Sequence, residues 1–106
     1  MAENIALTEA VYYILLALNS PLHGYGIMQF AEEMSSGRVK LAAGTLYGAL
    51  SSLCEKGWIK ELPVVEGSRK KEYEITDAGR QVLKNELSRL RQLVKCGEKI
   101  LGGENQ

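Results

Sequence analysis

The spacing of apolar side chains changes period twice along the 106 residues, and this order limits the possible folds more than any other feature. Up to about residue 56, apolar residues recur every three or four positions, which is the period of an amphipathic helix. From Trp58 to Ile75 the chain is richer in β-branched and aromatic residues, which favour strands. Helical spacing returns after Thr76. We therefore expect helices, a short β segment and a final helix, in that order.

Three helices are predicted before the β segment. Thr8 is the expected N-cap of the first helix, which ends before Pro21. The second begins near Gly24, and its buried stripe is predicted to be Ile27, Phe30, Ala31 and Met34. The third covers residues 44–56, and Gly57 suits the left-handed position after a helix end. Its predicted apolar face consists of Leu46, Leu50, Leu53 and Cys54.

The remaining segments complete the predicted architecture. Residues 58–65 and 70–75 indicate a two-stranded hairpin, and residues 38–42 form a link with room for a brief strand. Thr76 and Asp77 cap the long final helix. The fold class predicted is mainly α with a small β-hairpin, in the order of a winged helix-turn-helix domain. We assign residues 1–76 to that domain and residues 77–106 to a C-terminal helix with a frayed tail.

Composition excludes several other classes of protein. With 45% apolar and 25% charged residues the chain is typical of globular domains, and no apolar run approaches the roughly 18 residues of a membrane span. The N-terminus lacks the basic flank of a secretory signal, so we expect a cytoplasmic protein with Cys54 and Cys96 reduced. One histidine and two distant cysteines form no ligand cluster. Neither a metal nor a cofactor is predicted.

Charge is zero overall but unevenly distributed. Residues 1–37 contain four glutamates and no lysine or arginine, whereas residues 38–71 contain seven basic and three acidic residues. A locally basic middle in a neutral chain is typical of a confined nucleic-acid contact surface.

Four segments together resemble a known family. They are His23-Gly24-Tyr25-Gly26-Ile27, Gly44-Thr45-Leu46-Tyr47-Gly48-Ala49-Leu50, the segment from Leu53 to Ile59, and the segment from Lys70 to Gly79. In order and spacing they are similar to the short form of the PadR-like transcriptional regulators. The resemblance implies a homodimeric repressor that binds a pseudo-palindromic operator. The third helix would enter the major groove, the hairpin would lie along the DNA backbone, and the last helix would join two subunits.

Two positions depart from the family pattern. Gly48 stands where the family often has proline, and Ser51 and Ser52 stand where it often has basic residues. The first departure is compatible with the fold. The second leaves open which bases are read.

The candidate DNA-binding residues come from four segments. They are Tyr25 in the second helix, Arg38 and Lys40 in the link, Thr45, Tyr47, Gly48, Ser51, Ser52 and Lys56 in the third helix, and Arg69, Lys70 and Lys71 in the hairpin. Small and hydroxylated side chains permit close approach to bases and phosphates. The alternatives are a merely solvated helix face, a hairpin whose charges prevent edge pairing, and a core-edge role for Tyr25.

The last helix carries a regular apolar stripe of Leu83, Leu87, Leu90, Val94 and Leu101. Such a stripe can pack on its own domain, but its length beyond a compact domain favours a dimer interface. The resemblance also allows a small hydrophobic or aromatic effector at that interface. The last helix has no aromatic residue, so the aromatic drug-binding cleft of some relatives does not carry over.

Two other classes of function compete with that of a DNA-binding regulator. A winged helix can instead serve as a protein–protein interaction module, which the zero net charge and the serines of the third helix keep open. No nucleophile–base pair or glycine-rich phosphate loop is visible, so we predict that the chain is not an enzyme.

Overall fold

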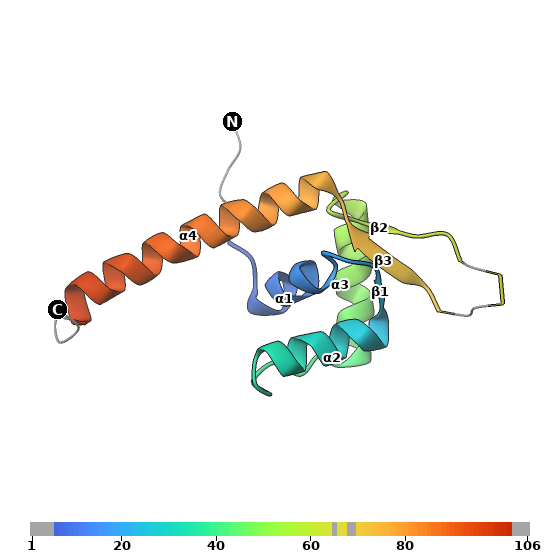
Figure 1. The fold of residues 1–106 in the computed structure, drawn as a ribbon, viewed down its shortest axis with the longest axis horizontal. Helices are drawn as coiled ribbons and strands as arrows, with labels where there is room; N and C mark the ends of the chain where they lie inside the picture. The colour runs from blue at the N-terminus through green and yellow to red at the C-terminus, as the bar shows by residue number, and fades with distance from the viewer. Residues whose placement is uncertain (1–5, 65, 68–69, 103–106) are drawn as a thin grey trace.

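The computed structural model describes residues 6–64, 66–67 and 70–102. Its elements, in order, are α1 (Glu9–Ala17), β1 (Leu22–His23), α2 (Gly24–Met34), α3 (Ala43–Glu55), β2 (Ile59–Glu61), β3 (Glu72–Ile75) and α4 (Asp77–Leu101) (Figure 1). The predicted fold class, mainly α with a small β element, is confirmed. The last helix, α4, begins at Asp77 with Thr76 as its N-cap, where the sequence predicted its start.

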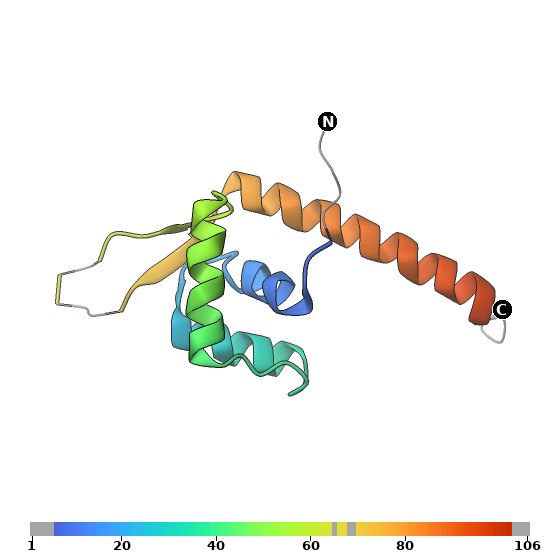
Figure 2. The ribbon, with the colours of Figure 1, turned by 180° about the vertical axis from the view of Figure 1, so that it is seen from behind.

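The core lies where α1, α2, α3 and the sheet meet. Its largest fully buried side chains are Ile14, Leu15 and Leu18 around α1, Ile27 in α2, Leu46 and Leu50 in α3, and Ile59 in β2. Both views of the ribbon show α1 between α4 and α2 (Figures 1 and 2). The burial of one apolar face of each element in this single core stabilises the arrangement.

The sheet contains one strand more than expected. Its order is β1-β3-β2, and both pairings are antiparallel. The prediction of a brief strand within residues 38–42 is wrong, because those residues form no strand. The additional strand is β1, which directly precedes α2. In β1, Leu22 pairs with Tyr73 and His23 with Glu72. This pairing fixes the start of α2 to the base of the hairpin formed by β2 and β3, which we call the wing.

The expected helix ends are confirmed. Thr8 Oγ1 accepts the Val11 N–H at 3.1 Å, and Thr76 Oγ1 accepts the Gly79 N–H at 3.1 Å. Gly57 has φ +77°, and α3 ends in a Schellman motif in which the Trp58 N–H donates to the Leu53 carbonyl at 3.1 Å. Local sequence is enough for these ends because each cap involves residues three to five positions apart.

The buried stripe of α2 is shorter than predicted. Ile27 and Ala31 are fully buried and Phe30 packs partly against the core, but Met34 is 60% exposed. Met34 lies seven residues after Ile27 and so on the same face, yet it is the last residue of α2 and lies beyond the core. The prediction that Met34 is buried is therefore wrong.

The first half of α4 belongs to the domain and the second half leaves it. Leu83 packs against the core, and Glu86 is only 3% exposed. The Glu86 carboxylate accepts the Leu7 N–H at 3.1 Å and two hydrogen bonds from Arg89 at 2.7 Å, and the guanidinium lowers the pKa of Glu86. Residues 91–101 are all exposed, and they project away from the wing (Figure 1).

Candidate nucleic-acid interface

One face of α3 is open to solvent along its whole length. Leu46, Leu50 and Leu53 hold the opposite face on the core. The six DNA-binding residues predicted in the third helix all lie exposed, as helical periodicity requires: Thr45, Tyr47, Gly48, Ser51, Ser52 and Lys56. Apart from Tyr47 this face carries only glycine and small hydroxyl side chains near its middle, so another molecule can approach the α3 backbone closely.

The glycines of this face have no role in internal packing. A Cβ built on Gly44 or Gly48 would meet nothing within 4 Å. A glycine inside a helix costs about 1 kcal/mol relative to alanine. Glycine at position 48 therefore costs the helix stability, and internal packing does not require it. This indicates that the absence of a side chain at Gly48 allows another molecule to approach α3.

A groove of about 510 Å³ lies beside α3, between the start of α2 and the wing. Its lining residues are His23, Gly24, Tyr25, Tyr47, Lys70 and Lys71. Four of the predicted DNA-binding residues, from α2, α3 and the wing, are thus brought together. Two lysines and two tyrosine hydroxyls around one groove form a surface that favours an anion.

Close packing of α3 on the start of α2 shapes this groove. A Cβ built on the buried Gly24 would overlap the Tyr47 hydroxyl and would lie 2.9 Å from Tyr47 Cζ. Glycine at this position leaves room for the Tyr47 ring where it now lies, and a larger residue would require the ring to move. Tyr47 is nonetheless 50% exposed and Tyr25 64% exposed, so both rings remain accessible from solvent.

His23 lines this groove but is not among the predicted DNA-binding residues. It is the N-cap of α2, and its Nδ1 accepts the Gly26 N–H at 3.2 Å. Histidine is not among the common N-cap residues, so the sequence gives little sign of this role. The imidazole is half-buried and lines the groove.

The wing lysines differ in their surroundings. Lys71 Nζ lies 3.9 Å from a carboxylate oxygen of Glu61 across the hairpin, with both side chains substantially exposed. Exposed pairs of this kind are weak, so Lys71 can exchange its partner for a more strongly bound anion. Lys70 is exposed at the same edge of the groove. Arg69 lies outside the described residues.

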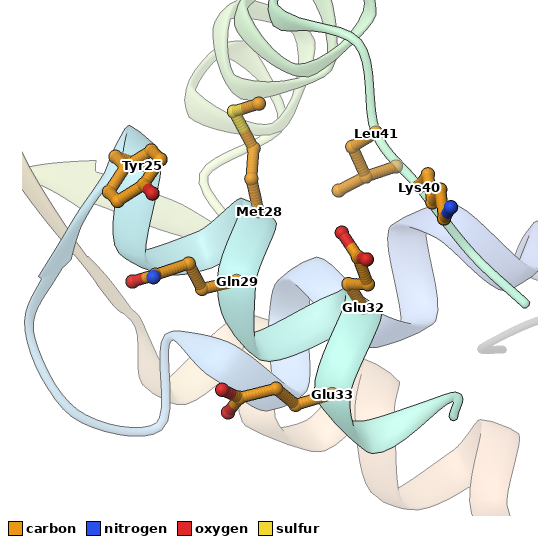
Figure 3. A pocket seen from close by; sticks show the side chains of 7 residues that line it. All are labelled: Tyr25, Met28, Gln29, Glu32, Glu33, Lys40 and Leu41. Atoms are coloured by element: carbon orange, nitrogen blue, oxygen red, sulfur yellow. The ribbon is translucent and has the colours of Figure 1, made fainter. Parts of the chain in front are cut away.

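Three of the predicted contacts lie away from this groove. The Arg38 guanidinium pairs with the Glu9 carboxylate of α1, which raises the pKa of Arg38. Lys40 lines a separate groove of about 330 Å³ along α2, and Figure 3 shows Glu32 on the same side of α2 as Leu41 and Lys40. The Lys56 ammonium lies 5.5 Å from the centre of the Trp58 ring, at the end of α3 remote from the groove.

The stripe on α4 is divided between two environments. Leu83 packs on its own core and Leu90 is half-buried. Leu87, Val94 and Leu101 are 38%, 57% and 81% exposed, and Leu93 and Ile100 add to the same open surface. The exposed part of the stripe is an uncovered apolar surface on a helix about 37 Å long, at 1.5 Å per residue.

Neither a metal site nor a membrane-spanning helix is found in the part of the chain that the structure describes. Within residues 6–64, 66–67 and 70–102, no three His, Cys, Asp or Glu side chains come together to hold a metal ion. No helix formed by those residues has the length and apolar character needed to cross a membrane.

Known proteins resemble this chain in both sequence and fold. The sequence model of the transcriptional regulator PadR-like family matches residues 14–85, from the second half of α1 to the first turns of α4. The chain belongs to the PadR-like family of transcriptional regulators. Its fold is similar to that of a PadR family transcription regulator from Clostridium difficile, with a TM-score of 0.76, 24% identity, and coverage of 89% of this chain and 99% of that one.

A second solved structure of this PadR-like family is that of Bacillus subtilis PadR in complex with operator DNA. It has a TM-score of 0.62 and 30% identity, and the match covers 72% of this chain and 45% of that one. A curated relative is an uncharacterized 37.1 kDa protein in transposon TN4556 of Streptomyces fradiae, 39% identical over 79 residues. The match covers 74% of this chain but only 22% of that relative, so this chain spans about a fifth of its length.

Proposed function

We propose that this PadR-like regulator binds double-stranded DNA through the exposed face of α3 and the groove beside it. The open face of α3, with glycines that the fold itself does not use, is the observation that carries the proposal. In this arrangement α3 lies in the major groove, and Lys70 and Lys71 lie along the phosphate backbone. The 30% identical Bacillus subtilis protein forms a complex with operator DNA, which supports DNA binding by this chain as well.

The first test is a titration with labelled duplex from upstream of the protein's own gene, with scrambled duplex as competitor, at several salt concentrations. Specific binding should weaken steeply with salt, because each lysine on a phosphate releases counterions. An affinity that is the same for both duplexes and does not change with salt concentration would count against the proposal. In that case a winged helix that binds a protein partner would be the better interpretation.

We further propose that the regulator acts as a homodimer joined through α4. Leu87, Val94 and Leu101 are exposed and recur every seven residues, which is the repeat by which two helices pair in a coiled coil. A two-fold protein would present two copies of α3 to half-sites about one DNA turn apart. Such a dimer on a promoter would act as a repressor by blocking access to it, and a reporter gene should then be expressed more strongly without the protein.

The dimer can be tested with two matched substitutions on α4. Val94→Glu places a charge in the stripe, whereas Gln92→Glu places the same charge on an exposed position outside it. Sedimentation equilibrium should give a monomer for Val94→Glu and a dimer for Gln92→Glu. A dimer that survives Val94→Glu at low micromolar concentration would contradict this interface.

A small hydrophobic or aromatic effector has a candidate site between α1 and α4. A cavity of about 350 Å³ there is lined by Leu7, Glu9, Tyr12, Tyr13, Glu86, Arg89 and Leu90. We propose that a ligand in this cavity changes the angle of α4 and so the spacing of the two α3 helices. An active ligand should raise the melting temperature and lower operator affinity. Unchanged operator affinity across a broad panel of phenolic and multidrug-like compounds would argue against an effector.

A further inference from the structure

The imidazole of His23 has one nitrogen committed to the fold and one that is not. Its Nδ1 accepts the Gly26 N–H at 3.2 Å and so caps α2. A nitrogen that accepts a hydrogen bond carries no proton, so the neutral ring carries its proton on Nε2. Among the described residues, Nε2–H has no hydrogen-bond partner.

The position of the ring makes this N–H available to a molecule bound in the groove. His23 lines the groove together with Tyr25, Tyr47, Lys70 and Lys71, where the proposed function places a DNA phosphate. Pairing of His23 with Glu72 in the sheet fixes the backbone, and the cap to Gly26 fixes the ring. A donor held by two contacts loses little conformational freedom on binding, which favours a hydrogen bond to a phosphate oxygen.

We propose that His23 has two roles: Nδ1 caps α2, and Nε2–H donates to a backbone phosphate oxygen of bound DNA. The proposal rests on the proposed DNA-binding function and adds a neutral contact to it. A neutral donor differs from a lysine in a measurable way. It contributes affinity at every salt concentration but displaces no counterion, so it leaves the slope of affinity against salt unchanged.

Substitutions can separate the two roles. Serine is a good N-cap residue, so His23→Ser keeps an acceptor for the Gly26 N–H but removes the ring N–H. His23→Thr does the same with a β-branched residue suited to the extended conformation of β1 and serves as the second variant. His23→Ala removes both roles and should melt about 4–8 °C lower, as expected for one lost cap.

Operator affinity, its salt slope and the melting temperature should be measured for each variant. We expect His23→Ser to melt like the wild type, to bind about tenfold more weakly, and to keep the wild-type salt slope. Lys70→Ala should instead lower the slope by about 0.9, whereas Lys99→Ala, at the far end of α4, should leave it unchanged.

Three results would overturn the inference. If His23→Ser and His23→Thr melt and bind like the wild type, His23 is only a cap. If these variants lose about one unit of salt slope, the ring binds as a cation and not as a neutral donor. If the wild type itself shows no salt-dependent binding to any duplex, the proposed function fails together with the inference. The first two results leave the proposed function intact.

Discussion

Gly48→Ala should make the protein more stable and a weaker DNA binder at the same time. Gly48 lies inside α3, and a Cβ there would meet no atom within 4 Å, so the methyl group causes no strain. Alanine is favoured over glycine in a helix interior by about 0.8–1.0 kcal/mol. For a domain of this size that gain raises the melting temperature by about 4–8 °C.

The effect of Gly48→Ala on DNA binding has the opposite sign. If α3 lies in the major groove with Gly48 against the bases, an added methyl group forces the helix outward. Overpacking of a close interface by one carbon costs about 1–3 kcal/mol, which corresponds to a loss of affinity between about fivefold and 150-fold. Thermal denaturation and titration with operator DNA measure the two effects separately.

Ser88→Ala is the control for Gly48→Ala. Ser88 also lies exposed inside a helix, where alanine is favoured over serine, but it is on α4, outside the apolar stripe and far from the groove. We expect a smaller rise in melting temperature without a fall in operator affinity. If Gly48→Ala is more stable and binds operator DNA as tightly as the wild type, α3 does not approach DNA at Gly48 and the docking proposed here is wrong.

Three further predictions concern stability. Gly79→Ala should lower the free energy of unfolding by about 3 kcal/mol, because its Cβ would overlap the Trp58 carbonyl oxygen, and a loss below about 1 kcal/mol in urea would refute this close approach. Thr8→Ala removes only a cap and should lower the free energy of unfolding by about 1 kcal/mol. Thr76→Ala removes a cap and also the 2.6 Å hydrogen bond from the Thr76 hydroxyl to the Gly57 carbonyl, so it should lower the free energy of unfolding by about 2 kcal/mol. Equal losses of stability in the two variants would contradict a contribution from the bond to Gly57. The pKa of Glu86 is lower in the folded state than its ordinary value of 4.5. The ionised carboxylate therefore stabilises the fold at pH values above 4.5, and this stabilisation is lost as the pH falls through the folded-state pKa. Glu86→Gln should therefore be about 1–2 kcal/mol less stable near neutral pH, and a deficit that persists unchanged in strong acid would count against this linkage.

The groove beside α3 is formed by contacts between distant segments of the chain, which the sequence does not indicate. Its base is the two-residue strand β1, too short to show a β period, and the pairing of His23 with Glu72 joins residues 49 positions apart. Tyr47 and Gly24 meet only because α3 packs on the start of α2. Charge alone placed Arg38 with the DNA contacts, whereas the fold places its guanidinium against Glu9.

Sequence alone predicts the order of the four helices and the hairpin, the start of α1 and of α4, the end of α3, and the exposed face of α3. Each of these depends on residues within about one or two helical turns, where periodicity and capping act directly. Only the packed structure shows that Met34 is exposed, that Leu83 packs against the core, and that His23 lines a groove together with two lysines. These features depend on which distant segments pack together, and local propensity carries no information about such contacts.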